Sequence, residues 1–403
     1  MHAGGARSYT SYRYYGACHG QCRETDQIRG MNMHSLMSKH RIAIIFGGVS
    51  TEHDVSVVSA RSVAEHLDTE RFDPVYVGID KQGRWFAGPG AFDLLKTGEN
   101  HDVQRVILST DPEKKGFLAI ESGELFAVDV VFPVLHGPRG EDGTMQGFLE
   151  LAGIPYVGCD NISSAIAMDK DMTKRVLAQR GIPVVKGTCV TRWMWQIDRD
   201  EVLKEISTTL TPPLFIKPST MGSSIGITRA DRGDEIVQGI DKALMFSPKV
   251  VIENAVVNAL EIEVAVLGNN EPVASVAGQI IPSNEFYDFN AKYVDGKTEL
   301  VIPAKIGKAL MEDIRFAAVD SFVTIGGSGM ARVDFLVSPD TFYVNEINTI
   351  PGFTSISMYP KLWEATGIPY TQLITSLVDL AFKRYEESRT LTKVIALDKG
   401  LGV

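Results

Sequence analysis

The chain has 403 residues, of which 44% are hydrophobic, and its formal net charge at pH 7 is −10. This length predicts two or three domains with enough apolar residues for a core. The negative charge argues against a nucleic acid as partner, because phosphate backbones are bound by clustered Lys and Arg. No stretch reaches the roughly 18–20 consecutive apolar residues of a membrane-spanning helix, so we expect no membrane partner.

Residues 1–37 differ from the rest, since they are rich in Tyr, Gly, Ser and Arg and lack apolar periodicity. This composition predicts a disordered extension or an over-long start. They also lack the continuous apolar region of a secretory signal, although a transit peptide stays an open alternative. The four cysteines, at 18, 22, 159 and 189, match neither a zinc site nor a disulfide framework, which favours a reducing, cytoplasmic setting.

The first part of the chain after this segment alternates strand and helix patterns. Strands are expected at 41–46, 72–79 and 125–135, with a helix at 55–67. This alternation predicts an α/β domain with a parallel sheet. Ligands bind beyond the carboxyl ends of such strands, which is where Gly47, Gly48, Glu52 and His136 fall.

The remaining elements follow in two groups. A long helical pattern covers 161–179, and strands are expected near 184–190, 214–217, 225–228 and 250–253. From about residue 255 the pattern predicts strands at 261–267 and 273–281, a polar loop at 283–299 and a helix at 304–324.

Several common nucleotide or hydrolase motifs do not fit. The chain has neither a P-loop nor a G-x-G-x-x-G dinucleotide motif. Gly222-Ser-Ser224-Ile-Gly226 matches G-x-S-x-G, the nucleophile elbow of serine hydrolases. That mechanism needs a histidine downstream of the serine, and all eight histidines lie at or before position 136. A serine hydrolase is therefore excluded by chain order.

The most informative cluster lies near the C-terminus. Arg332 and Asp334 share one face of an expected strand, and Glu346 and Asn348 share one face of the next, because side chains alternate along strands. Two carboxylates and an amide oxygen suit Mg²⁺. Each residue alone is more simply a solvated or capping residue, but the four at matched spacing indicate a phosphoryl-transfer site without a P-loop.

A glycine-rich segment upstream provides phosphate-binding groups. Lys217 ends an apolar strand, and Gly222 and Gly226 let the backbone approach phosphates closely. Lys170 offers a second cation. The alternative is that both lysines are solvated surface residues. This alternative is weaker for Lys217, because Lys217 ends an apolar strand directly before the glycine-rich segment.

Lys217 with its Gly-Ser-Ser loop, Glu253, Glu261 and the C-terminal cluster together resemble the ATP-grasp fold, and within it the D-alanine–D-alanine ligase family. The resemblance covers about residues 38–388. It rests on Gly47-Gly48-x-Ser50-x-Glu52-His53-x-Val55-Ser56, His136-Gly137-x-x-Gly140-Glu141-Asp142-Gly143-Thr144, Met168-Asp169-Lys170, Ala291-Lys292-Tyr293 and Asn345-Glu346-x-Asn348-x-x-Pro351-Gly352.

The resemblance implies an α/β, in part α+β, ATP-grasp architecture, with ATP held between the central and C-terminal domains. The expected parts are a Rossmann-like domain at 38–158, a central domain at 159–253, a catalytic domain at 254–388 and a tail at 389–403. It also implies a cytoplasmic homodimer that supplies D-alanyl-D-alanine to peptidoglycan and cell-wall synthesis.

The implied reaction proceeds by phosphorylation of one D-alanine carboxylate and attack by the amine of a second D-alanine. By similarity, Glu52 would hold the first ammonium, and Ser223 and Tyr293 would link to Glu52 and close the site. Arg332 and the Gly352 N–H would form the oxyanion site. His136 would lie near the first carboxylate and Ser357 would bind the second.

The resemblance also assigns the nucleotide site. Asp334, Glu346 and Asn348 would bind two Mg²⁺ ions, with Mn²⁺ as a substitute. The ATP contacts would come from phosphate-binding Lys170, Lys217, Lys292, Ser223 and Ser224, adenine-reading Glu253 with the backbone of Asn254 and Val256, ribose-binding Glu261, and Phe286 and Leu336 on the two faces of the base. Residues 254 and 256–260 are less typical of the family, so the register between Glu253 and Glu261 is the weakest assignment.

Tyr293 bears on which acceptor is used. Relatives that join D-alanine to a hydroxy acid often place His in this loop, where a cation would disfavour an amine acceptor. A neutral tyrosine therefore favours the dipeptide. The alternatives left open are a ligase using D-lactate or D-serine, and a nucleotide-binding regulator without turnover, which would be expected to lack part of the C-terminal cluster.

Overall fold

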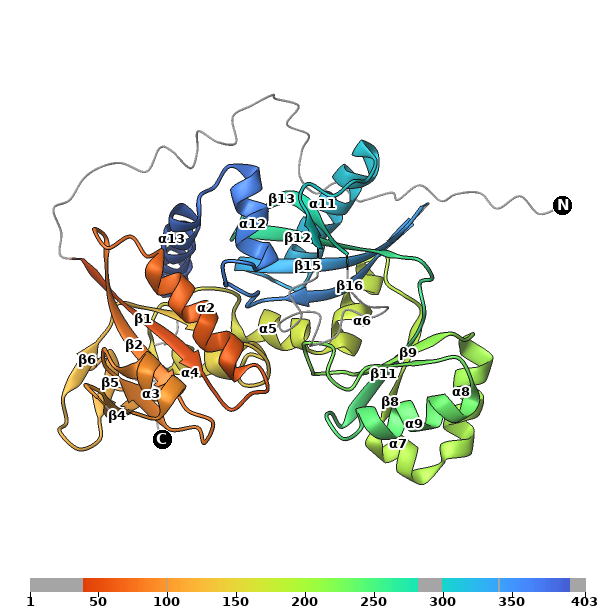
Figure 1. Cartoon of the computed structure of the whole chain (residues 1–403), viewed down its shortest axis with the longest axis horizontal. Coiled ribbons are helices and arrows are strands. Elements are labelled where there is room, and N and C mark those ends of the chain that lie inside the picture. Colours follow the sequence, from red (N-terminus) through yellow and green to blue (C-terminus); the bar gives the residue numbers. More distant parts are fainter. Residues whose placement is uncertain (1–38, 100, 282–298, 340, 392–403) are drawn as a thin grey trace, which may run out of the picture. The chain divides into compact units, whose positions relative to one another are not determined.

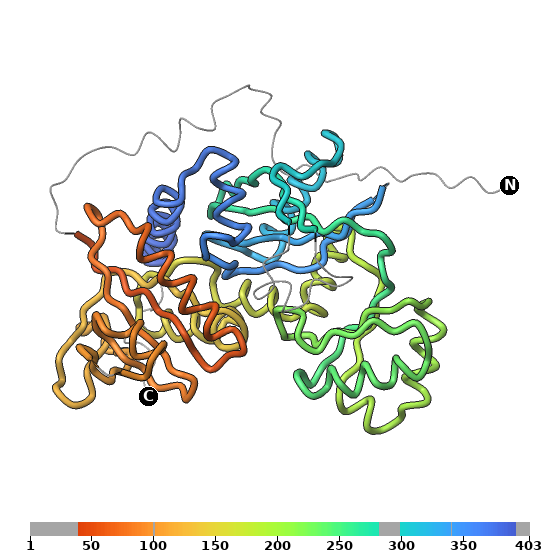
Figure 2. Tube along the Cα trace, viewed as in Figure 1, coloured from red at the N-terminus to blue at the C-terminus, as the bar shows by residue number. Residues whose placement is uncertain are grey.

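The computed structural model describes residues 39–99, 101–281, 299–339 and 341–391, which form three sheets with their covering helices (Figure 1; Figure 2). The predictions for residues 1–37, for most of the loop at 283–299 and for the tail after 391 lie outside this range. Among the described helices, none is both long and apolar enough to cross a membrane. The domain boundaries expected from the sequence stay a prediction.

The first sheet has seven strands in the order β6-β5-β4-β3-β2-β1-β7. Its elements are β1 (His40–Gly47), α2 (His53–Glu65), β2 (Phe72–Ile79), β3 (Trp85–Ala87), α3 (Ala91–Thr97), β4 (Gln104–Leu108), β5 (Gly116–Ala119), β6 (Leu125–Ala127), β7 (Val130–Val134) and α4 (Thr144–Ala152). The first strand, the first helix and the second strand confirm the expected elements.

The expectation of a parallel sheet is only partly correct. β1 pairs in parallel with β2 and β7, whereas β2, β3, β4, β5 and β6 pair antiparallel with one another. Parallel neighbours need a long crossover, and the connection from β2 to β3 is a turn closed by the Asp80 N–H to Arg84 carbonyl hydrogen bond of 3.0 Å. The parallel part still places its carboxyl ends together at Gly47 and Val134.

The expected strand at 125–135 is wrong as a single element, because β6 and β7 lie at opposite edges of the sheet. Asp129 interrupts it. The Arg41 N–H donates to the Asp129 carboxylate at 2.7 Å, and the Asp129 N–H donates to the Arg41 carbonyl at 2.8 Å. These bonds fix the start of β7 beside β1, and β6 belongs to the hairpin on the other side.

The second sheet is a four-stranded antiparallel sheet in the order β10-β9-β11-β8, with α7, α8 and α9 around it (Figure 1). Its elements are β8 (Gly187–Thr191), α7 (Arg192–Ile197), α8 (Arg199–Thr209), β9 (Leu214–Pro218), β10 (Thr228–Ala230), α9 (Gly233–Ala243) and β11 (Lys249–Asn254). The strand expected at 225–228 is displaced, since it starts only at Thr228. The preceding residues turn, with the Ile225 N–H donating to the Gly222 carbonyl at 3.1 Å.

The helix expected at 161–179 is two helices, α5 (Asn161–Met168) and α6 (Lys170–Arg180). Asp169 separates them, because its backbone is extended at φ −87° and ψ 101°. Its carboxylate accepts the N–H groups of Asp171 and Met172, which makes it the N-cap of α6. The break places Lys170 in the first turn of a helix beside the glycine-rich segment, where the Lys170 N–H donates to the Ser219 carbonyl at 2.9 Å.

The third sheet has the order β14-β13-β12-β15-β16 and is antiparallel throughout. Its elements are β12 (Leu260–Gly268), β13 (Val273–Ile281), β14 (Glu299–Val301), α11 (Lys308–Thr324), β15 (Gly329–Ser338), β16 (Thr341–Asn348), α12 (Met358–Thr366) and α13 (Tyr370–Arg389). Val264 and its even-numbered neighbours on β12 pack with α11, and Ala265 and Leu267 face the core shared with α12. Glu261 and Glu263 lie on the same face of β12 as Ala265 and Leu267, because strand side chains alternate.

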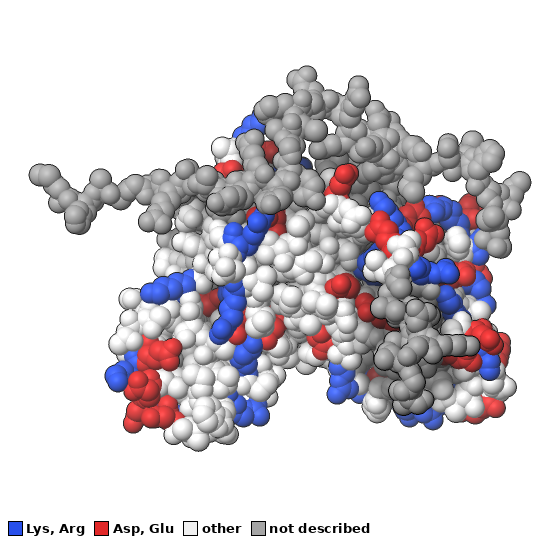
Figure 3. Space-filling model, turned by 180° about the vertical axis from the view of Figure 1, so that it is seen from behind, with Lys and Arg blue, Asp and Glu red and all other residues white. Residues whose placement is uncertain are grey.

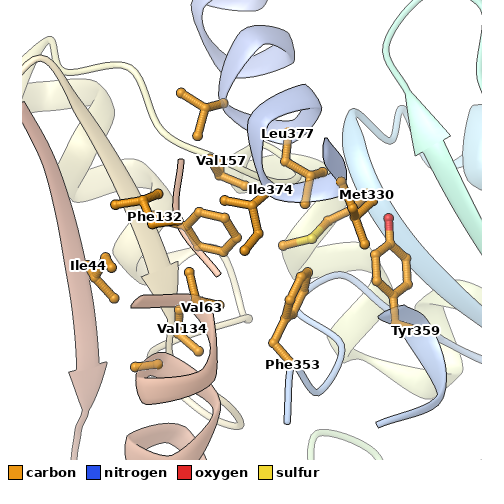
Figure 4. Packing of buried hydrophobic residues seen from close by; sticks show 14 of the residues in the cluster. Ile44, Val63, Phe132, Val134, Val157, Met330, Phe353, Tyr359, Ile374 and Leu377 are labelled. Carbon is orange, nitrogen blue, oxygen red and sulfur yellow. The ribbon is translucent and has the colours of Figure 1, made fainter. Parts of the chain in front are cut away.

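One hydrophobic core joins the first and third sheets, as Figure 4 shows. Phe132 of β7 packs edge-on against Phe353, with ring centroids 5.7 Å apart. Tyr359 of α12 and Leu377 of α13 complete the same cluster. Close-packed side chains leave little room for the elements they join to shift relative to one another. The shared core holds the carboxyl ends of β1 and β7 against the chain that follows β16, which brings residues from both halves to one site.

Candidate active site

Two cavities adjoin at the end of β16. The first, here called the nucleotide-side cavity, has a volume of about 390 Å³ and lies between the second and third sheets. The second, here called the substrate cavity, has a volume of about 460 Å³ and lies between the first and third sheets. Gly222, Glu263 and Glu346 line both. A group transferred from one cavity to the other would therefore pass the C-terminal cluster.

The cross-strand register brings the predicted cluster together. Asp334 of β15 stands directly opposite Glu346 of β16, and Arg332 stands opposite Asn348. The Asn348 amide donates through Nδ2 to Asp334 Oδ2 at 3.0 Å. Residues directly opposite each other on one face have Cβ atoms roughly 5 Å apart. The spacing that the sequence suggested is therefore a real juxtaposition of two carboxylates, an amide and a guanidinium.

The donor set at this register fits Mg²⁺. Both carboxylates and the amide oxygen of Asn348 are hard oxygen ligands, and Mg²⁺ usually takes one or two carboxylates with substrate phosphates and water. Within the described residues no group of three or more Asp, Glu, His or Cys side chains could hold a metal by itself. The set thus suits a metal shared with a phosphate-bearing ligand better than a permanently enclosed ion.

Arg332 is held by carboxylates on two strands. Its Nε and Nη2 donate to the two oxygens of Asp334, each at 2.7 Å, and Nε lies 2.9 Å from Glu263 Oε2. Burial acts to lower its pKa, but the charges of Asp334 and Glu263 outweigh burial and raise it well above the usual value. Glu263 was missed in the sequence, although it lies two residues from Glu261 on the same face of its strand. The Arg332 guanidinium therefore places a permanent positive charge on the wall of the substrate cavity, next to Asp334 on the wall of the nucleotide-side cavity.

The two predicted phosphate lysines line the nucleotide-side cavity. Lys170 Nζ donates to the Met221 carbonyl at 2.9 Å and lies 3.1 Å from Glu346 Oε2. Lys217 Nζ donates to Asn345 Oδ1 at 3.0 Å. Both lysine side chains are nearly buried. Other charged residues, of both signs, lie exposed on the described part of the face in Figure 3. The interpretation of these lysines as solvated surface residues is wrong.

Glu253 lies between two lysines. Its carboxylate lies 2.8 Å from Lys217 Nζ and also pairs with Lys174 Nζ, and its exposed fraction is 1%. Burial would raise the pKa of this carboxyl, but the two ammonium groups outweigh burial and lower it to about 2. Lys174, which the sequence reasoning missed, lies one helical turn after Lys170. The side chain of Glu253 thus orients Lys217, and it does not line the nucleotide-side cavity.

The other predicted ATP contacts, at the adenosine and at the phosphates, are distributed unevenly. Val256, Glu261, Leu336 and Ser224 line the nucleotide-side cavity. Asn254 does not, since its side chain accepts from the Thr211 N–H at 3.1 Å and its own N–H donates to the Lys186 carbonyl at 3.0 Å. Phe286 and Lys292 lie outside the described residues. Their predicted roles stay predictions.

In the substrate cavity, Glu52 and Ser223 meet as predicted. The Ser223 hydroxyl donates to Glu52 Oε1, joining the start of α2 to the glycine-rich segment. Glycine is needed opposite this carboxylate, because a Cβ at Gly137, which has φ +80°, would lie 2.9 Å from Glu52 Oε2. Tyr293, the third member of the predicted link, lies outside the described residues. The described pair already places one carboxylate at the edge of the cavity.

His136 lines the substrate cavity with both ring nitrogens engaged. Nδ1 lies 3.1 Å from the Ile350 carbonyl and Nε2 lies 3.0 Å from Ser59 Oγ. Burial lowers the pKa of His136, so the ring is neutral at pH 7. A carbonyl only accepts, so the proton sits on Nδ1 and Nε2 accepts from Ser59. His136 is therefore held rigidly through its ring edges, and its contact with a substrate carboxylate stays a prediction.

Glu141 is a further carboxyl that the sequence reasoning did not assign, although it lies in the motif that begins at His136. It lines the substrate cavity, and its Oε1 accepts from the Gly137 N–H at 2.8 Å. Burial and the nearby charge of Glu52 raise the pKa of Glu141 to about 8. The cavity therefore contains one carboxyl that is mostly protonated at neutral pH beside one that contacts Ser223.

Gly352 and Ser357 both line the substrate cavity. A Cβ at Gly352 would lie 2.8 Å from Ser357 Oγ, so a larger residue there would displace the Ser357 hydroxyl. Ser357 is the N-cap residue of α12, and its Oγ accepts from the Thr354 N–H at 3.0 Å. The start of α12 therefore lies at the wall of the substrate cavity, and a helix N-terminus suits a carboxylate or an oxyanion.

Comparison with known proteins leads to the same family. Residues 41–159 match the family model described as D-ala D-ala ligase N-terminus, and residues 176–379 match the model described as D-ala D-ala ligase C-terminus. The chain is 46% identical over 357 residues to the D-alanine–D-alanine ligase of Heliobacterium modesticaldum, covering 88% of this chain and 97% of that protein. It is 44% identical over 355 residues to the enzyme of Natranaerobius thermophilus, covering 87% and 97%.

Solved structures agree. The D-alanine–D-alanine ligase of Coxiella burnetii aligns with a TM-score of 0.78 at 34% identity, covering 88% of this chain and 97% of that one. The VanG D-Ala:D-Ser ligase of Enterococcus faecalis aligns with a TM-score of 0.78 at 39% identity, covering 85% and 100%. The chain therefore belongs to the D-alanine–D-alanine ligase family and has the ATP-grasp fold of that family.

Proposed function

We propose that this chain joins two D-alanine molecules into D-alanyl-D-alanine, with ATP converted to ADP and phosphate, in the cytoplasm and for peptidoglycan precursor synthesis. The observation that carries the proposal is the register of Arg332, Asp334, Glu346 and Asn348 at the junction of the two cavities. It supports phosphoryl transfer from a nucleotide on one side to a carboxylate on the other.

In the first step, an oxygen of the first D-alanine carboxylate attacks the γ-phosphorus, and ADP leaves. Lys170 and Lys217 would bind the phosphates, because their ammonium groups are fixed at the wall of the nucleotide-side cavity. Asp334, Glu346 and Asn348 would hold two Mg²⁺ ions. When bound, the metal neutralises phosphate charge and orients the transferred group.

In the second step, the amine of the second D-alanine attacks the acylphosphate carbonyl, and phosphate leaves from the tetrahedral intermediate and takes up the proton that the amine loses. Glu52 would hold the first ammonium, in an orientation that Ser223 fixes. Arg332 and the Gly352 N–H would stabilise the oxyanion. Ser357, which also lines this cavity, would bind the second carboxylate.

D-Serine as acceptor is the second candidate, because a D-Ala:D-Ser ligase is 39% identical to this chain. D-Lactate is less compatible with the neutral Tyr293 predicted to lie near the acceptor. The test is ATP-dependent phosphate release by the purified protein with Mg²⁺ and D-alanine, L-alanine, or D-alanine mixed with D-serine or D-lactate, with the products identified by mass. D-Alanyl-D-alanine as the main product in every competent mixture is expected, and a mixed product in excess would contradict the proposal.

Replacing Ser223 with alanine is expected to raise the KM for the first D-alanine and lower kcat, together by about tenfold to a hundredfold in kcat/KM, because the hydrogen bond to the Glu52 carboxylate is lost. The KM for ATP should change less. Initial rates with varied D-alanine and with varied ATP check this, with Ser122→Ala on an exposed turn as the matched control. An unchanged kcat/KM for D-alanine would contradict the role of this link.

A homodimer is proposed from the family resemblance. Light scattering during size-exclusion chromatography should give roughly twice the chain mass of 44.1 kDa. A single peak at the monomer mass in the micromolar range would contradict it.

A further inference from the structure

We propose that Lys361 binds the carboxylate of the second substrate and thereby selects acceptors that carry a carboxylate. This inference rests on the proposed function and adds a specificity residue to it. The observation that carries it is the position of Lys361 on the wall of the substrate cavity, beside Ser357, Met358 and Gly352. Lys361 is a recognition group for the acceptor and does not line the nucleotide-side cavity.

The charges around the substrate cavity single out Lys361. The described lining carries four acidic side chains and two permanently basic ones, namely Glu52, Glu141, Glu263, Glu346, Arg332 and Lys361. Arg332 already pairs with Asp334 and Glu263. Within the part of the chain that the structure describes, the ammonium of Lys361 makes neither a hydrogen bond nor an ion pair. An amino acid bound there would therefore meet an uncommitted positive charge.

The helix that carries Lys361 directs this charge to the acceptor side. α12 begins at Met358 with Ser357 as N-cap, so Lys361 lies four residues after Ser357, on the same face. Helical side chains point back towards the N-terminus, which turns the Lys361 stem towards Ser357 and the cavity. No acidic residue in the first turn of α12 compensates this charge. A lysine near the positive end of a helix is unfavourable unless an anion lies nearby.

The chemistry of the two substrates explains why a cation is needed at this end. The first D-alanine carboxylate is converted to an acylphosphate beside Arg332, so Arg332 and the proposed metal ligands would balance its charge. The second carboxylate keeps its negative charge from binding to product. An ammonium that is not shared with the proposed metal ligands can hold this carboxylate throughout and leave the amine directed towards the first substrate.

A competition experiment isolates this contact. Wild type and Lys361→Met turn over D-alanine in the presence of D-alaninamide, which has the same amine and methyl group but no carboxylate. The ratio of D-alanyl-D-alanine to D-alanyl-D-alaninamide, measured by mass, does not depend on the amount of folded enzyme. It should fall at least about tenfold in Lys361→Met, because a charge-assisted hydrogen bond is lost only for D-alanine. Lys361→Arg should keep the ratio within a few fold.

Two controls separate this contact from a general change in surface charge or in cavity shape. Lys308→Met, at an exposed position at the start of α11, should leave the ratio unchanged. The ratio of D-alanine to D-serine incorporation should also be unchanged in Lys361→Met, since both acceptors carry a carboxylate. An active Lys361→Met protein with the wild-type amide ratio would overturn the inference while leaving the proposed function intact. A wild-type protein that forms neither product would reject the proposed function, and this inference with it.

Discussion

Replacing Arg332 with methionine is expected to lower kcat by about 10²–10³-fold, the usual effect of removing one oxyanion donor. The guanidinium lies on the wall of the substrate cavity, 2.7 Å from each oxygen of Asp334 and 2.9 Å from Glu263. Its loss removes the fixed positive charge and leaves two carboxylates facing each other without compensation. ADP release at saturating ATP and D-alanine measures the effect.

Arg332→Lys separates charge from geometry. A lysine keeps the positive charge but cannot bind both oxygens of Asp334 as a planar fork. We expect it to recover only part of the activity lost in Arg332→Met. The dissociation constant for ATP, measured by displacement of a fluorescent nucleotide, should change much less than kcat in both variants. A kcat within tenfold of wild type in Arg332→Met would contradict the role of this residue.

Replacing Glu253 with glutamine is expected to destabilise the protein by about 3–5 kcal/mol, because breaking a buried ion pair leaves an uncompensated charge. Here two ammonium groups, those of Lys174 and Lys217, lose their common partner. Thermal and urea unfolding measure this, with Glu205→Gln at an exposed position as the matched control. The double variant Lys174→Met with Glu253→Gln should recover part of the loss, and a Glu253→Gln protein as stable as wild type would contradict the account.

The same carboxyl predicts a pH dependence. The folded-state pKa of Glu253 is lowered from 4.5 to about 2, so its contribution to stability is fully present above pH 4.5 and is lost as the pH falls towards 2. The difference in unfolding free energy between wild type and Glu253→Gln should therefore shrink between about pH 5 and pH 3. Urea unfolding of both proteins across this interval checks the sign, and a difference that grows on acidification would contradict it.

The sequence alone predicted the elements whose patterns are local. The strands β1, β2, β12 and β13 were expected from the sequence, and β1 shows the continuous apolar run that marks a strand buried on both faces. The sequence did not predict where a strand or helix pattern is interrupted. Asp129 ends β6 and caps β7 through a hydrogen bond to Arg41, 88 residues away, and Asp169 splits a helical pattern by capping α6. A carboxylate that caps looks the same in sequence as one exposed on a helix surface.

The functional site divides in the same way. Period-two spacing was enough to pair Arg332 with Asp334 and Glu346 with Asn348, and the motifs around Lys170 and Glu52 named the family. Only the tertiary structure showed that Glu263 pairs with Arg332, that Lys174 pairs with Glu253, and that Glu141 and Lys361 line the substrate cavity. These contacts join strands and helices far apart in the chain. Cross-strand register and the packing of the shared core decide them, and no local pattern records either.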